Sequence, residues 1–206
     1  MAMIGPFPRR VLIVIGALAL SAATLLTLAG INIPTGTQPK VGQHADGRYV
    51  IDPDARGPLI GSELIIPSDA VTADGARYGA ASTARTAAGL PPARLIILDL
   101  FATWCPPCQQ ETPLLREFDR AYRAQGLEII GISVQERAET VRAYAKRYAL
   151  EYPILVDADG ALFRLAGAGG LPTKILLDPS GRVIAVLPRP FAAEDGAMLI
   201  EPLLNP

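Results

Sequence analysis

Two cysteines two residues apart are the residues in this chain best suited to chemistry. Cys105 and Cys108 are its only cysteines, and Pro106 and Pro107 separate them. A pair at this spacing can alternate between a dithiol and an internal disulfide. At the start of a helix, free N–H groups and the helix dipole lower the pKa of the first thiol. We therefore predict that Cys105 is the nucleophile and that Cys108, one turn further on, is the resolving thiol.

A half zinc site and a permanent structural disulfide are the two alternative readings of this pair. A zinc site needs about four ligands, and the only histidine, His44, lies in a predicted linker. A purely structural disulfide would close too small a loop to stabilise the fold much. We expect a redox-active disulfide with no bound metal and no further cofactor.

Two acidic residues near the cysteines are candidates for proton transfer. Asp99 lies inside the apolar run 95–101, where burying an unpaired carboxylate is costly. It is either a buried acid with a raised pKa that takes the proton of Cys108, or a strand-end residue that reaches solvent. Glu111 follows Cys108 by three residues and shares its helix face. It either tunes the thiols or is an ordinary solvated charge.

The elements that must position these residues alternate along the second half of the chain. Apolar runs of strand length alternate with segments of helical spacing, which predicts parallel strands joined by crossover helices. The turn sequence DPSG at 178–181 predicts an antiparallel hairpin. The expected strands are 59–66, 94–101, 127–134, 152–157, 173–178 and 182–187, and the expected helices are 107–125, 137–149 and 192–204.

A glycine-rich loop, 167–173, ends with Leu171-Pro172 directly before a strand. Proline there removes a donor from the strand ladder. A cis bond before Pro172 would turn the chain sharply and leave main-chain groups free to pair with an extended peptide. X-Pro bonds are usually trans, so the residues alone do not decide the isomer.

The N-terminal region has the composition of a membrane anchor. No charged residue lies between Arg10 and Lys40, and 11–33 is almost entirely apolar or small. As a helix, 11–33 would rise about 34 Å, enough to span a bilayer core. Arg9 and Arg10 predict a cytoplasmic N-terminus, 1–10, with the remainder outside. A cleaved signal peptide is the alternative. Either way, a linker (34–58) leads to an exported domain (59–206).

The charge balance excludes one class of partner. Charged residues make up 19% of the chain and the formal net charge is -1. A polyanion partner requires a basic surface, so we expect no nucleic-acid binding.

Residues 95–115, LIILDLFATWCPPCQQETPLL, resemble the active-site segment of thioredoxin-like proteins of the TlpA/ResA/CcmG group. The resemblance extends through Gly170-Leu171-Pro172-Thr173 to about residue 186. It implies an α/β thioredoxin fold, a central mixed sheet flanked by helices, with the N-terminal transmembrane helix in front. Many members are membrane-tethered and extracytoplasmic.

The resemblance also assigns roles to residues. It implies that Cys105 attacks, Cys108 resolves, Glu111 is the active-site acid and Pro172 is a cis residue beside the disulfide. Trp104 and Leu171, which flank these motifs, join Pro172 as expected substrate-binding residues. Asp99 falls where thioredoxins carry a buried aspartate, whereas many tethered members have asparagine.

The expected activity is that of a protein thiol-disulfide oxidoreductase, a single-pass inner-membrane protein with its catalytic domain in the periplasm or outside. The resemblance suggests a reductant of exported proteins with cysteines, such as apocytochrome c in cytochrome c biogenesis or copper-site proteins. Such a reductant needs a membrane electron donor. A copper(I) metallochaperone and a thiol peroxidase are the alternatives from other functional classes.

Overall fold

The computed structural model describes residues 42–43, 49–52, 54–58, 60–79 and 88–204. All of them belong to one compact unit, Pro39–Pro206. The predicted N-terminal residues 1–10 and membrane anchor 11–33 lie outside the described residues, as does His44. Within the described ranges, no helix is long and apolar enough to cross a membrane.

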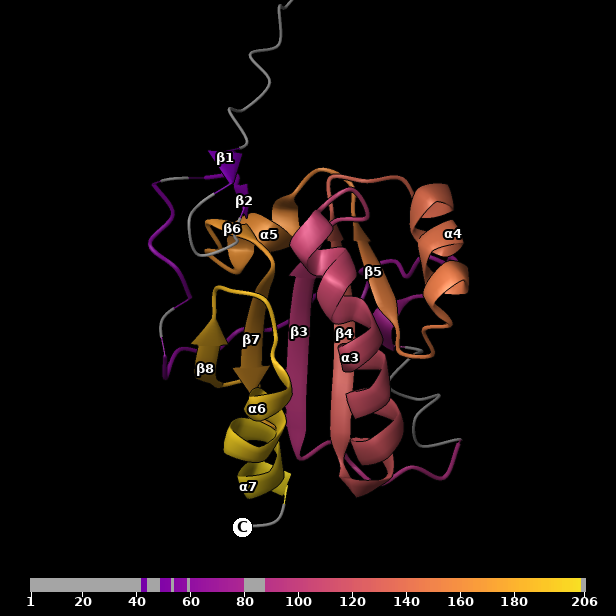
Figure 1. The fold of residues 1–206 in the computed structure, drawn as a ribbon, viewed down its shortest axis with the longest axis vertical. Coiled ribbons are helices and arrows are strands. Elements are labelled where there is room, and N and C mark those ends of the chain that lie inside the picture. The colour runs from indigo at the N-terminus through magenta and orange to yellow at the C-terminus, as the bar shows by residue number, and fades with distance from the viewer. Residues whose placement is uncertain (1–41, 44–48, 53, 59, 80–87, 205–206) are drawn as a thin grey trace, which may run out of the picture. The chain divides into compact units, whose positions relative to one another are not determined.

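A five-stranded mixed sheet forms the centre of this unit, with strand order β5-β4-β3-β7-β8 (Figure 1). The first three of these strands are parallel to one another, and β7 runs antiparallel to both β3 and β8. The mixed sheet and its C-terminal hairpin are therefore as predicted. The strands are β3 (Leu95–Phe101), β4 (Leu127–Val134), β5 (Ile154–Asp157), β7 (Thr173–Leu177) and β8 (Val183–Leu187).

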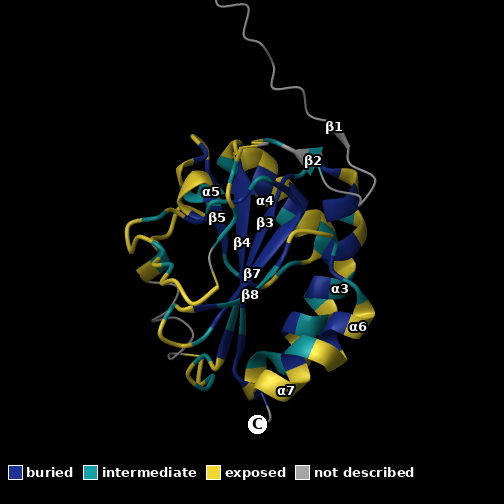
Figure 2. Ribbon diagram, turned by 90° about the vertical axis from the view of Figure 1, so that its left-hand side faces the viewer, coloured by how far each residue is buried: buried dark blue, intermediate teal, exposed yellow. Residues whose placement is uncertain are grey.

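The helices that connect parallel strands lie on one face of the sheet, as the handedness of such connections requires. Successive crossovers from β3 to β4 and from β4 to β5 move in one direction, and right-handed connections then place both helices on the same side. Figure 2 shows α3, α6 and α7 on one side of the buried strands. The helices are α3 (Pro106–Tyr122), η1 (Arg123–Gln125), α4 (Ala138–Tyr148), α5 (Ala161–Leu165), α6 (Ala193–Asp195), η2 (Gly196–Ile200) and α7 (Glu201–Leu204).

The segment 60–79 crosses behind the sheet in the view of Figure 1. At one edge Gly61 and Leu64 donate hydrogen bonds to the main chain of 181–183, and at the other Val156 donates to Val71. The prediction of a strand at 59–66 is wrong for its described part, 60–66. Over 60–66 this segment forms only an isolated bridge, Glu63 to Arg182, because it meets the edge of β8 irregularly.

A second, smaller sheet has the order β1-β2-β6. Its strands are only two residues long: β1 (Gly42–Gln43), β2 (Tyr49–Val50) and β6 (Gly170–Leu171). Two of these strands lie in the segment expected to be linker, 34–58. The small sheet therefore joins residues near the start of the unit to the glycine-rich loop before β7.

Candidate active site

The two cysteines form a disulfide where β3 passes into α3. Cys105 is the N-cap residue of α3, and Pro106 and Pro107 occupy the first helical positions, where a missing N–H costs nothing. The Cα atoms of the two cysteines are 5.3 Å apart. Cys105 is 0% exposed and Cys108 1% exposed. The predicted placement of a redox-capable pair at a helix start is confirmed.

A buried group of charged residues lies beneath this turn, between the sheet and α3. Asp99 in β3 stands directly opposite Lys174 in the antiparallel strand β7, so their side chains share one face of the sheet. The Lys174 ammonium forms an ion pair with Glu111 of α3, and both side chains are almost completely inaccessible. Two carboxyl groups and one cation therefore share a water-poor space between the sheet and α3.

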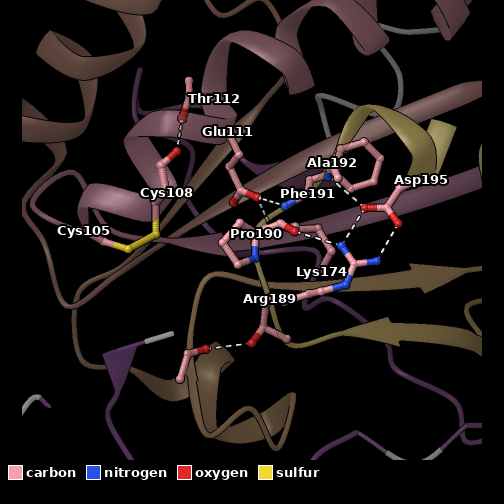
Figure 3. Close-up of polar contacts among 12 residues, drawn as sticks. Cys105, Cys108, Glu111, Thr112, Lys174, Arg189, Pro190, Phe191, Ala192 and Asp195 are labelled. Atoms are coloured by element: carbon pink, nitrogen blue, oxygen red, sulfur yellow. Dashed lines mark hydrogen bonds and ion pairs between the residues drawn. A yellow bond between two sulfur atoms is a disulfide. The ribbon is translucent and has the colours of Figure 1, made fainter. Parts of the chain in front are cut away.

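Glu111 is held by two donors to the same oxygen. Figure 3 shows its carboxyl group directed toward Lys174 and the main chain of Phe191. The Lys174 ammonium and the Phe191 N–H both donate to Oε2. Beside it, Arg189 forms a two-point ion pair with Asp195, with N–O distances of 2.8 and 2.6 Å. The reading of Glu111 as a solvated helix charge is wrong, because it faces the sheet.

Asp99 is also buried, at 3% exposure, which excludes the reading in which it reaches solvent. Its pKa is raised from 3.8 to about 7, mainly by burial and also by the nearby Glu111 charge, while the Lys174 charge opposes both. Burial likewise raises the pKa of Glu111, opposed by Lys174 and the Phe191 hydrogen bond. Asp99 Oδ1 and Glu111 Oε1 have no hydrogen-bond partner among the described residues. Near neutral pH, Asp99 can therefore both accept and release a proton.

Lys174 is a component of this group that the sequence motifs did not identify. It is fully buried, the costliest placement for an ammonium unless it is paired. The signal that could have found it is the same one that marks Asp99, a charged residue inside an apolar strand.

The loop before Cys105 is fixed by Glu136, an acidic residue that sequence reasoning missed. The carboxylate of Glu136, just after β4, accepts hydrogen bonds from the Thr103 N–H at 2.8 Å, from the Thr103 hydroxyl and from the Ser133 hydroxyl at 2.7 Å. Gln109 donates to the Thr103 carbonyl at 2.6 Å. These contacts tie the active-site turn to the end of β4 and to the first turns of α3.

The three expected substrate-binding residues meet around the small sheet. The Leu171-Pro172 bond is cis, as the resemblance implied. Trp104 is 46% exposed, and the ring of Tyr49 contacts its ring edge-on at a centroid distance of 6.0 Å. Leu171 is buried and pairs with Tyr49 of β2. The main chain directly before Pro172, which was expected to be free, therefore pairs with strand β2 of the same chain.

No cluster of three or more histidine, cysteine, aspartate or glutamate side chains suited to a metal ion occurs within the described ranges. The chemistry available at the site comes from the two sulfur atoms and the buried acids. Such a set can exchange a disulfide and move the proton that this exchange requires.

Comparisons with known proteins identify a matching family and several relatives. The profile of the AhpC/TSA family matches residues 79–186, just over half of the chain. Thiol-disulfide oxidoreductase ResA of Geobacillus thermodenitrificans (strain NG80-2) is 34% identical over 100 residues, which cover 48% of this chain and 58% of that protein. The protein of the same name from Bacillus subtilis (strain 168) is 30% identical over 92 residues, covering 45% and 51%. The chain thus spans just over half the length of these curated relatives.

Solved structures support the fold. A thiol:disulfide interchange protein of the thioredoxin family from Chlorobium tepidum TLS aligns with a TM-score of 0.55 at 26% identity, covering 71% of this chain and all of that one. A secreted Mycobacterium tuberculosis disulfide oxidoreductase, described as homologous to E. coli DsbE, aligns with a TM-score of 0.51 at 21% identity, covering 66% and 92%. The predicted thioredoxin fold and the resemblance to the ResA group are confirmed.

Proposed function

Because the chain belongs to the AhpC/TSA family, whose thioredoxin-like domain it carries, we propose that it is a protein thiol-disulfide oxidoreductase. The observation that carries the proposal is the Cys105–Cys108 disulfide at the start of α3, the helix that also carries the buried Glu111, with the buried Asp99 on the strand that leads into it. The names of its relatives support this activity. No cofactor beyond the disulfide itself is needed.

The first step is attack on a substrate. In the reduced chain, the Cys105 thiolate attacks one sulfur of a substrate disulfide, and the substrate S–S bond breaks as a mixed disulfide forms. The other substrate sulfur leaves as a thiolate and takes up a proton. Cys105 acts here because it caps the helix, where the dipole favours a thiolate.

The second step needs a base, and Asp99 fits that role. The Cys108 thiol gives its proton to the Asp99 carboxylate, attacks the Cys105 sulfur and expels the second substrate thiolate. Two electrons have then passed to the substrate, and Cys105–Cys108 is the disulfide seen in the structure. Burial raises the pKa of Glu111, whereas its ion pair with Lys174 opposes that rise and favours the carboxylate, so we assign the mobile proton to Asp99.

We place the protein among the reductants. Pro106 and Pro107 have no N–H groups, so the first two helical positions give the Cys105 thiolate no donor. Its stabilisation is therefore modest, and the disulfide is correspondingly favoured over the dithiol. Reducing members of the fold have potentials of about -270 mV and strong oxidants about -120 mV.

The substrates would be disulfides in exported proteins, with the N-terminal segment 11–33 holding the domain at the outer face of the inner membrane. Apocytochrome c and copper-site proteins are the substrate classes we propose, and a membrane protein would supply the electrons that regenerate the dithiol.

The test is disulfide exchange by the full-length chain. We expect the reduced protein to reduce insulin disulfides, Cys105→Ser to abolish this, and Cys108→Ser to accumulate a mixed disulfide at Cys105. The potential of the pair, measured against glutathione buffers, should be about -250 mV or lower. A value near -120 mV would overturn the reductant assignment. Hydroperoxide turnover, or tight one-to-one copper(I) binding without exchange, would contradict the activity itself.

A further inference from the structure

The disulfide is almost completely buried in this structure. Cys105 and Cys108 are 0% and 1% exposed. Thiol-disulfide exchange requires the attacking sulfur to approach along the S–S bond. Some neighbouring part of the chain must therefore move before a protein substrate can react.

One short segment that contacts the active-site turn is 49–52, which we call the strap. Tyr49 pairs with Leu171 and Val50 with Gly170 in antiparallel register. Beyond this two-residue ladder, the N–H groups of Ile51 and Asp52 both donate to the carbonyl oxygen of Gly169, at 2.9 and 3.0 Å. The strap therefore occupies the main-chain edge immediately before the cis bond to Pro172.

The strap also reaches the residue next to the nucleophile. The ring of Tyr49 meets the ring of Trp104 edge-on, and Trp104 directly precedes Cys105. One short segment therefore contacts both the strand edge at 170–171 and the active-site turn. An extended polypeptide with its cysteine over Cys105 would need these same two surfaces.

In the glycine-rich loop 167–173, two glycines allow the main chain of another segment to lie close to the loop. A Cβ atom added at Gly169 would lie 2.9 Å from the Asp52 carbonyl oxygen, and one added at Gly167 would lie 3.1 Å from that of Gly57. Both glycines leave room for a second chain rather than for side chains.

We propose that the strap is an internal substitute for substrate: it holds the strand-pairing position that an extended polypeptide takes next to Cys105, and such a polypeptide binds by displacing it. This inference rests on the proposed thiol-disulfide exchange. A segment tethered in the same molecule competes at a high effective concentration, so only polypeptides that pair well along 169–171 gain access.

The test compares two substrates on the full-length chain. Tyr49→Ala removes the contact with Trp104, and Gly169→Ala pushes the Asp52 carbonyl away. Gly79→Ala is the matched control, because its added Cβ would meet Ser68 at an ordinary 3.5 Å. Reduction of insulin should accelerate about tenfold in both strap variants, reflecting a lost internal competitor. Reduction of cystamine, a disulfide without peptide groups, should change less than about threefold, since it needs no strand pairing.

An insulin rate that falls or stays constant in the strap variants would overturn the proposal, as would an equal rise for both disulfides. If no variant exchanges thiols at all, the proposed function fails, and hydrogen exchange still decides on the strap. Carboxymethylated insulin B chain, an extended polypeptide without thiols, should accelerate exchange of the Ile51 and Asp52 amides. Unchanged protection of these two amides would reject displacement.

Discussion

Helix α3 carries ion pairs in two very different surroundings. Near its start, Glu111 pairs with Lys174 where the side chains are 2% and 0% exposed. At its far end, Arg120 and, just beyond the helix, Arg123 pair with Glu151, whose side chain is 51% exposed. A buried pair must overcome a large desolvation cost, whereas an exposed pair gains and costs little. Burying Glu111 and Lys174 carries a desolvation cost that the exposed pair avoids. We infer that this buried pair is kept for its role in the chemistry of the site.

The sharpest test of this contrast is removal of the buried cation. Lys174→Met leaves the Glu111 carboxyl group in the interior without its partner. We expect a loss of about 3 to 5 kcal/mol in the free energy of unfolding, measured by urea denaturation. Adding Glu111→Gln should recover most of the loss because no unpaired charge remains. Equal stability of Lys174→Met and the parent would mean that the pair is not buried in solution.

Asp99→Asn should increase the free energy of unfolding, whereas Lys174→Met should decrease it. The pKa of Asp99 is about 7 in the folded chain and 3.8 ordinarily, so the folded state holds a proton that the unfolded state has lost. Stability contributed by this proton is present below about pH 4 and is lost as the pH rises toward 7. We therefore expect Asp99→Asn to stabilise the fold by up to about 4 kcal/mol at pH 8 and to have little effect at pH 4.

The same variant should be impaired in catalysis. Without the carboxylate, release of the mixed disulfide should slow and lose its pH dependence near 7. Thermal unfolding between pH 4 and pH 8, with exchange rates over the same range, provides both readouts. A stability gain that does not vary with pH would argue that Asp99 is ionised throughout.

Loss of a neutral buried hydrogen bond on α3 should change the free energy of unfolding less than the substitutions at Lys174 and Asp99. The Tyr144 hydroxyl lies 2.6 Å from the Thr112 hydroxyl, which itself donates to the Cys108 carbonyl. Tyr144→Phe removes one hydrogen bond and leaves the Thr112 donor satisfied, so it should cost about 1 kcal/mol in unfolding free energy. A cost as large as that of Lys174→Met would show that this contact is part of the charged group.

The exposed end of α3 should show the smallest effect. Arg120→Ala removes the 3.1 Å contact with Glu151, and Arg123 still pairs with that carboxylate at 2.9 Å. Solvent screening leaves such a pair little net value. We expect no measurable shift of the thermal midpoint at moderate salt. A clear decrease in the thermal midpoint would show that the exposed ion pair also stabilises the fold, and the difference proposed between the two ends of α3 would not hold.

The elements around the cysteines could be predicted because local patterns determine them. The apolar run of β3, the two prolines at the start of α3 and the DPSG turn each carry their signal within a few residues. A charged residue inside an apolar strand identifies Asp99. The same signal in TKILL identifies Lys174, yet the partner of Lys174 lies on another element and is visible only in the fold.

The small sheet could not be predicted in this way. Strands of two residues have no periodicity, and the pairing of 49–50 with 170–171 joins segments far apart in the chain. The strand expected at 59–66 shows the converse error. Its apolar residues satisfy a strand pattern, but Ile60 and Ile65 are 71% and 67% exposed because the segment only skirts the sheet edge.

The pairing of β2 with β6 has a consequence for self-association. An exposed row of unpaired main-chain groups can serve as a template on which a second copy adds a strand, the first step toward aggregation. At 170–171 that row is already filled, and the outermost strand of the small sheet, β1, is only two residues long. The chain thereby covers the strand edge beside its cis proline and limits strand addition there by a second copy.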